Sequence, residues 1–164
     1  MTKTDDIRQD FIERVGQIAQ AEGMPRSAGR IFGLLMFDGT AVSFGDLANQ
    51  LEISRGSVSS SVRLLEDRNV IRRIGKPGDR QDYFEFASQP FTGLLEDAVR
   101  RTKRARDDIG QSLASLPDDA TGPRERLTAY YNFYEAINGG LTQARTALPG
   151  QHGRQDHSKG KKHG

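Results

Sequence analysis

Two short helical patterns separated by a tight turn lie within residues 43–69, and they restrict the folds that this chain can adopt. The first helix is expected to start at Ser43, because Asp46 follows three residues later in a capping-box position. The second is expected to start at Ser54 and to end at Asn69, a residue that tolerates the left-handed conformation of helix ends. The apolar faces of the two helices consist of Leu47, Ala48 and Leu51, and of Val58, Val62 and Leu65. This order predicts a helix-turn-helix.

A turn-rich hairpin follows the second helix directly. Residues 70–74 and 81–86 are rich in β-branched and aromatic side chains, and the six residues between them include two glycines and a proline. We therefore predict a mainly α chain with a small β-hairpin. In this interpretation residues 25–87 form a winged helix-turn-helix, and the hairpin is its wing.

Further helices are expected on both sides of that domain. Residues 5–22 and 25–37 have helical patterns, and Gly29 and Gly33 lie one turn apart, which permits close packing of two helices. An apolar stripe from Phe91 to Leu116 would extend for about 40 Å and therefore needs a partner helix. A last helix opens at Pro123. It is expected to kink or end at residues 138–140, because each of two adjacent glycines costs about 1 kcal/mol relative to alanine.

Positive charge is concentrated in the helix-turn-helix and its wing. The whole chain has a net charge of only +2, but residues 54–80 carry seven basic and three acidic side chains, a local charge of +4. A basic stripe within a nearly neutral protein is typical of phosphate binding. The alternative is an ordinary solvated helix face beside a surface hairpin.

The second helix of the motif has the composition expected of a DNA-reading element. Its outer face carries short side chains and arginine, which allow the backbone to approach a major groove and the guanidinium to bind guanine. Its free backbone N–H groups can also bind a phosphate. The candidate DNA-binding residues on this helix are Ser54, Arg55, Gly56, Ser57, Ser59, Ser60 and Arg63.

The wing supplies the remaining candidates. Lys76 and Arg80 are expected at its tip, in an adjacent minor groove, and Arg72 and Arg73 are better placed for phosphate. Asp79 is expected to orient Arg80 or to brace the loop rather than to contact DNA.

These motifs resemble the MarR family of bacterial transcriptional regulators. The resemblance rests on Asp46-Leu47-Ala48-x-x-Leu51-x-Ile53-Ser54-x-x-x-Val58-Ser59-x-x-Val62-Arg63-x-Leu65-Glu66 and on the Gly-Asp-Arg sequence of the wing. Gly23-x-Pro25-Arg26-x-x-Gly29-Arg30-x-x-Gly33 is similar to the GbsR-like branch.

Membership would imply a homodimer held by the first helix (residues 1–24) and the last two (residues 88–149). It would also imply repression at a palindromic operator, often relieved by a small-molecule effector.

Other functions find little basis in the residues. The chain has no cysteine, its three histidines all lie beyond residue 150, and no set of catalytic side chains can be assembled, so we expect neither an enzyme nor a cofactor. No membrane span or signal peptide is evident, so a cytoplasmic protein is expected. The serious alternative is a winged helix that serves as an architectural DNA binder or a protein-interaction module without an effector.

Three segments remain open to more than one interpretation. Residues 150–164 are expected to form a disordered basic tail, either a phosphate tether or, through His152, His157 and His163, a weak metal site. The basic run 100–106 could contact DNA or face solvent and a partner helix. The aromatic side chains of Tyr130, Tyr131, Phe133 and Tyr134 could form a cation-binding cage or part of a dimer core.

Overall fold

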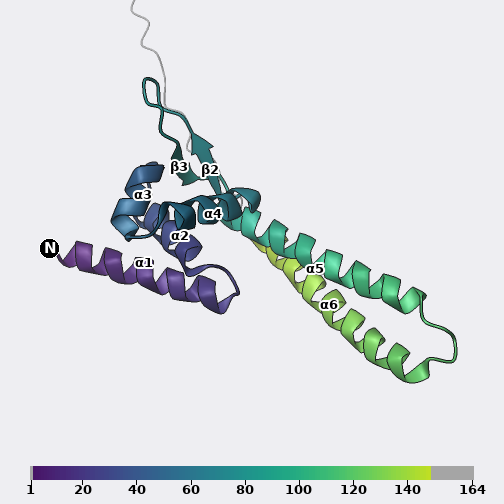
Figure 1. Ribbon diagram of the computed structural model, residues 1–164. Helices are drawn as coiled ribbons and strands as arrows, with labels where there is room; N and C mark the ends of the chain where they lie inside the picture. Colours follow the sequence, from purple (N-terminus) through teal and green to yellow (C-terminus); the bar gives the residue numbers. More distant parts are fainter. Residues whose placement is uncertain (1, 149–164) are drawn as a thin grey trace, which may run out of the picture.

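Six helices and three short strands make up residues 2–148, the part of the chain that the computed structural model describes (Figure 1). In chain order they are α1 (Lys3–Ala21), α2 (Arg26–Asp38), β1 (Val42–Ser43), α3 (Phe44–Leu51), α4 (Arg55–Asp67), β2 (Ile71–Ile74), β3 (Tyr83–Phe86), α5 (Pro90–Ala114) and α6 (Thr121–Ala147). The predicted class is confirmed: the chain is mainly helical with a small antiparallel sheet. Within these residues, no helix has both the length and the hydropathy needed to cross a lipid bilayer. The predicted tail, with its three histidines, lies outside the described residues.

The ends of α3 and α4 lie where their capping residues place them. The Ser43 hydroxyl accepts a hydrogen bond from the Asp46 amide at 3.1 Å, and the Ser54 hydroxyl accepts one from the Ser57 amide at the same distance. Asn69 adopts a φ of 55°, the left-handed conformation expected of it, and the chain turns there into β2. Local capping chemistry therefore determines the length of α4.

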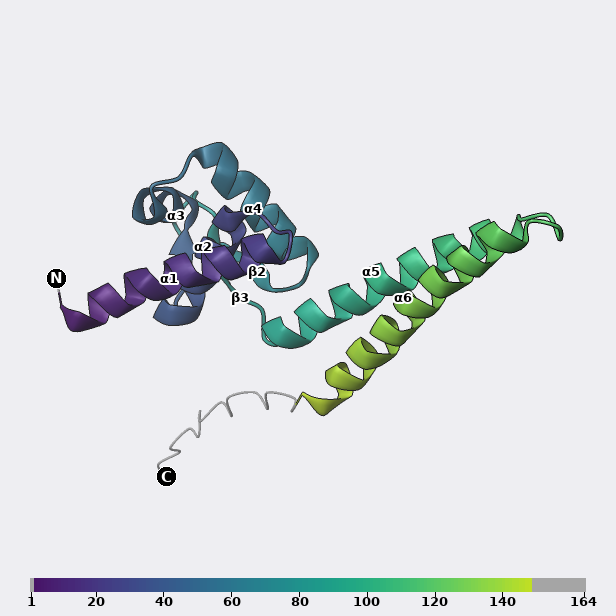
Figure 2. The same cartoon turned by 90° about the horizontal axis from the view of Figure 1, so that it is seen from below.

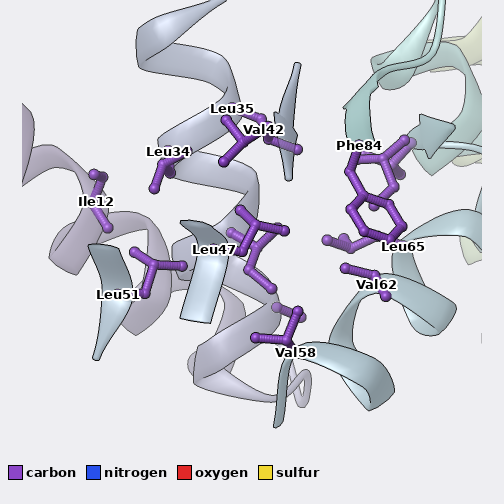
Figure 3. Packing of buried hydrophobic residues seen from close by; sticks show 14 residues of the cluster. Ile12, Leu34, Leu35, Val42, Leu47, Leu51, Val58, Val62, Leu65 and Phe84 are labelled. Atoms are coloured by element: carbon purple, nitrogen blue, oxygen red, sulfur yellow. The ribbon is translucent and has the colours of Figure 1, made fainter. Parts of the chain in front are cut away.

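The sheet contains one strand more than the hairpin predicted. β2 and β3 pair antiparallel with Ile71 opposite Phe86, and β1 adds to the free edge of β3 with Val42 opposite Phe84. Phe84 is completely buried and lies at the centre of the sheet's inner face (Figure 3). Strand β1 directly precedes α3, so its pairing with β3 connects the base of the wing to the start of that helix.

The core lies between α1, α2, α3, α4 and the sheet, and α2 passes through its middle (Figures 1 and 3). The predicted close packing at Gly29 is present, because a Cβ at that position would lie 2.5 Å from the Cβ of Ala19 and 2.6 Å from the Val15 carbonyl oxygen. Helices α1 and α2 thus meet backbone to backbone. The fully buried aliphatic side chains of the core include Ile12, Ile31, Leu34, Leu47 and Val58.

Helix α1 buries one apolar face, and it also carries apolar side chains that nothing else in residues 2–148 covers. Ile12, Gly16 and Ala19 are buried, whereas Ile7 and Ile18 are 52% and 56% exposed. Ile7 and Ile18 belong to the same helical stripe as Phe11 and Val15, but Phe11 contacts the Phe37 ring of α2 and Val15 lies beside Gly33, so only the ends of the stripe are exposed.

Helices α5 and α6 form an antiparallel hairpin that extends away from the other elements (Figures 1 and 2). The partner helix expected for the stripe of α5 is thus α6 of the same chain. The expected end at residues 138–140 is wrong, because α6 continues from Thr121 to Ala147. Asn138 donates hydrogen bonds of 3.0 Å to the Val99 carbonyl and to the Thr102 hydroxyl of α5, which offsets the low helix propensity of the two glycines beside it.

Candidate nucleic-acid interface

Helix α4 buries one face and exposes the face predicted to read DNA. Val58, Val62 and Leu65 are at most 2% exposed, and Ser61 is buried with its hydroxyl hydrogen-bonded to Ser27 of α2 at 2.7 Å. The predicted DNA-binding residues of the helix and its cap are exposed or half-buried: Ser54, Arg55, Gly56, Ser57, Ser59, Ser60 and Arg63. The structure therefore brings them together on one accessible surface.

The N-terminal end of α4 is organised by hydroxyl groups and by one aromatic ring. The hydroxyls of Ser54 and Ser57 lie 2.9 Å apart, and the Ser60 hydroxyl donates to the Ser57 carbonyl at 3.2 Å. The guanidinium of Arg55 lies 4.7 Å from the centre of the Phe44 ring, a cation–π contact between α4 and α3. Phe44 was not among the residues singled out from the sequence. The sequence places Phe44 at the start of the first helix of the motif, but its contact with Arg55 depends on how α3 and α4 cross.

The loop of the wing is braced by Asp79, as predicted. Its carboxylate accepts hydrogen bonds from the Gln81 amide at 2.9 Å and from the Tyr83 hydroxyl at 2.7 Å. These bonds hold the pKa of the Asp79 carboxyl below its ordinary value and raise the pKa of the Tyr83 phenol. The ammonium of Lys76 lies 4.0 Å from the centre of the Tyr83 ring. Tyr83 thus connects the two ends of the loop.

The two arginines of β2 have carboxylate partners within the chain. Arg72 donates to Glu85, its cross-strand neighbour, at 2.6 Å. Arg73 pairs with Glu66 of α4 at 3.2 Å and with Asp82 of the wing at 2.9 Å, so it links the wing to α4. The hydrogen bonds that Arg73 donates to the Glu66 carboxylate are the main reason why the pKa of Arg73 is raised.

The basic side chains of this face therefore fall into two groups. Arg72 and Arg73 are occupied by carboxylates, whereas among residues 2–148 no salt bridge involves Arg55, Arg63, Lys76 or Arg80. The opposite charges of Arg72 and Glu85 on the two strands of the hairpin could have indicated their ion pair from the sequence. The ion pair between Arg73 and Glu66 could not, because it depends on how the wing packs against α4.

The chain and its structure are similar to those of known transcriptional regulators. A family model described as "MarR family" matches residues 22–82. The transcriptional regulator MmpR5 of Mycobacterium tuberculosis is 30% identical over 119 residues, which cover 72% of each chain. The transcriptional repressor GbsR of Bacillus subtilis is 23% identical over 137 residues, which cover 77% of this chain and 76% of GbsR. A crystal structure described only as a transcriptional regulator superimposes with a TM-score of 0.74 at 25% identity, covering 85% of this chain and 95% of that one.

The match to MmpR5, over 119 residues, is longer than the winged domain, and the superposition on the solved structure covers 85% of the chain. Both the sequence resemblance and the arrangement of helices, sheet and wing therefore lead to one assignment. The chain belongs to the MarR family of DNA-binding transcriptional regulators.

Proposed function

We propose that the protein is a sequence-specific repressor that binds a palindromic operator as a homodimer and releases it in response to a small-molecule effector. The observation that carries the proposal is the exposed face of α4, on which serines, a glycine and two arginines without a salt-bridge partner among residues 2–148 lie together. Such a face fits the major groove. A protein with this function acts on the chromosome and is therefore cytoplasmic.

The basic residues of this face have different parts in the proposal. Arg63 reads a base from the middle of α4, and Lys76 and Arg80 enter the minor groove from the wing. Arg72 and Arg73 were predicted to bind phosphate; in the proposal they contribute less, because their carboxylate partners already neutralise them. The cap of α4, with Ser54 and Ser57, lies against a phosphate.

The uncovered apolar surface of the flanking helices supports the homodimer. Ile7 of α1 is 52% exposed, and Tyr130 and Phe133 of α6 are 52% and 55% exposed. The rings of Tyr130, Phe133 and Tyr134 contact one another, with centroids 5.2–6.4 Å apart. We assign this aromatic cluster to the contact with a second copy. Residues 1–24 and 88–149 then form the dimerisation region, and residues 25–87 form the DNA-binding domain.

A groove between α1, α2 and the start of α5 supports the effector. It has a volume of about 190 Å³ and an apolar lining that includes Val15, Ile18, Met24, Phe32, Phe91 and Leu94. A small apolar molecule would fit these walls. The test is a screen of apolar metabolites for release of the operator complex, with Ile18→Trp, which narrows the rim of the groove, expected to abolish the response.

The experiment that tests DNA recognition is selection of bound sequences from random duplexes at two salt concentrations. Enrichment of an inverted repeat is the expected result, and salt-sensitive binding without a motif would identify an architectural protein instead. No binding at either salt concentration would favour a protein-interaction module.

Two substitutions then separate reading from positioning. Arg63→Ala should cost about 1–3 kcal/mol of binding free energy and relax specificity at one base pair. Lys76→Ala should weaken binding to all sequences and reduce the salt dependence. Identical behaviour of the two variants would refute the assignment of Arg63 as a base reader.

A further inference from the structure

The end of the recognition helix is in close contact with the start of the long helix α5. A Cβ at Gly93 would lie 2.6 Å from the Asn69 carbonyl oxygen and 3.0 Å from that of Arg68. Only a residue without a side chain permits this approach, because the atoms opposite are backbone and cannot rotate away. The first turn of α5 therefore rests directly on the C-terminal end of α4.

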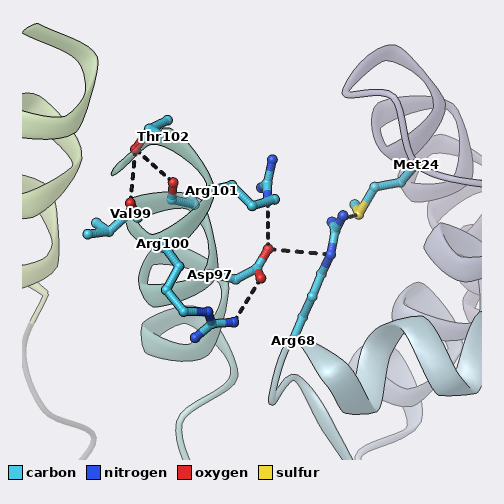
Figure 4. A network of polar contacts seen from close by, with 8 residues as sticks. Met24, Arg68, Asp97, Val99, Arg100, Arg101 and Thr102 are labelled. Atoms are coloured by element: carbon cyan, nitrogen blue, oxygen red, sulfur yellow. Dashed lines mark hydrogen bonds and ion pairs between the residues drawn. The ribbon is translucent and has the colours of Figure 1, made fainter. Parts of the chain in front are cut away.

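A largely buried carboxylate reinforces this contact one turn further along α5. The side chain of Asp97 is 11% exposed, and its Oδ2 lies 3.5 Å from Nε of Arg68, which is itself 18% exposed (Figure 4). The guanidinium of Arg68 also contacts the sulfur of Met24, in the turn between α1 and α2. Arg68 therefore connects three segments that are distant in the sequence.

Asp97 has two more partners, but both belong to α5 itself. Arg100 donates to Oδ1 at 2.9 Å and Arg101 donates to Oδ2 at 2.8 Å, from positions three and four residues further along the helix (Figure 4). These pairs satisfy the carboxylate without tying it to another element. Among residues 2–148, the only ion pair that links Asp97 to a residue outside α5 is the one with Arg68.

The connection between the two parts of the molecule is narrow. The buried residues of α5 are Pro90, Gly93 and Asp97, all at its N-terminal end, and α6 has none. Beyond that end the α5–α6 hairpin extends away from the winged domain (Figure 2). The angle between α4 and the hairpin is therefore determined by a few side chains.

We propose that Arg68, Gly93 and Asp97 form a joint that sets the angle between the recognition helix and the α5–α6 hairpin, and that this joint selects the spacing of the two operator half-sites. The inference rests on the proposed function, since it requires a dimer on an inverted repeat. A tilt of about 5° on a lever of about 20 Å, roughly half the length of α5, displaces α4 by about 1.7 Å in each subunit. Because both subunits of the dimer tilt, the distance between the two copies of α4 changes by about 3.5 Å, the rise of about one base pair.

The test compares binding to duplexes that carry the selected inverted repeat with its spacer unchanged, shortened or lengthened by one base pair. Arg68→Gln and Asp97→Asn should lower the preference for the original spacer by roughly threefold or more, because the tether between α4 and α5 is lost. Arg68→Lys keeps the positive charge and should keep most of the preference. Arg101→Gln is the matched control, since it removes a partner of the same carboxylate without breaking the link to α4.

Gly93→Ala provides a second, independent variant. Its methyl group would push α5 away from the backbone of Asn69, so the preferred spacer itself should change, whereas loss of the ion pair should only broaden the preference. Circular dichroism of each variant establishes that it is folded.

The outcomes separate the two proposals. An unchanged spacing preference in Arg68→Gln, Asp97→Asn and Gly93→Ala would overturn the joint while leaving the repressor intact. An equal loss in Arg101→Gln would also overturn it, because the effect would then not depend on the link to α4. A wild-type protein that enriches no inverted repeat would overturn the proposed function together with the joint.

Discussion

The packing of α1 on α2 makes Gly29→Ala a sensitive test of the structure. The added Cβ would lie 2.5 Å from the Ala19 Cβ, 2.6 Å from the Val15 carbonyl oxygen and 2.9 Å from the Gly16 Cα. Carbon atoms in contact are ordinarily about 3.5–4.0 Å apart, so the helices must separate by roughly 1 Å. None of the three opposing atoms can move by a side-chain rotation, because each is backbone or the first atom of a side chain.

The expected effect is the difference between two opposing contributions. Overpacking of a tight contact costs about 1–3 kcal/mol, and the rigid surroundings of Gly29 place it near the upper limit. Replacing glycine by alanine inside a helix returns about 1 kcal/mol. We therefore expect a net loss of about 2 kcal/mol in the free energy of unfolding, equivalent to a fall in Tm of roughly 4–8 °C.

The assay is urea unfolding followed by circular dichroism, at one fixed protein concentration because association would stabilise the folded state. Gly139→Ala is the control, since a Cβ there meets nothing within 4 Å and the same propensity gain of about 1 kcal/mol is then unopposed. If Gly29→Ala were as stable as the wild type, or if both variants were stabilised equally, the close contact between α1 and α2 would be refuted.

Two further predictions concern the interior of α4 and the wing. Ser61→Ala should lower the free energy of unfolding by about 1 kcal/mol, because the Ser27 hydroxyl loses its hydrogen-bond partner. Ser60→Ala, on the exposed face, should stay within about 0.5 kcal/mol of the wild type in the same urea assay, and equal effects would contradict the burial of Ser61. Asp79→Asn should lower the pKa of Tyr83 toward its ordinary 10.0, because the hydrogen bond to the carboxylate keeps the phenol protonated. The stabilisation from that bond is present below pH 10 and is lost as the pH rises through the raised pKa. NMR of labelled tyrosine follows this titration, and an unaltered pKa of Tyr83 in the variant would argue against the brace.

Local chemistry in the sequence was sufficient to predict the winged helix-turn-helix. Ser43, Ser54 and Asn69 act within a few residues of themselves, so they place the ends of α3 and α4 without knowledge of the rest of the fold. The apolar stripe of α4 predicted its buried face for the same reason. These residues also define the exposed face of the helix, and with it most of the candidate interface.

Features that depend on distant partners could not be predicted. Strand β1 is two residues long, too short for a pattern, and exists because β3 offers a free edge. Helix α6 continues past Gly139 because Asn138 is bonded to α5, which no local propensity can indicate. The carboxylate partners of Arg73 lie in two different segments of the chain. Arg73 was therefore predicted to bind phosphate, whereas in the fold its charge is paired with Glu66 and Asp82.

The internal pairing of arginines bears on how the protein would respond to the ionic strength of the cell. Of the seven basic residues in 54–80, Arg68, Arg72 and Arg73 have salt-bridge partners among residues 2–148, which leaves four per subunit to displace counterions from DNA. For two subunits on B-DNA the logarithm of affinity would fall with the logarithm of salt at a slope of about −7, against about −13 if all seven took part. A doubling of the salt concentration would then lower the affinity for the operator about 130-fold, rather than about 8,000-fold.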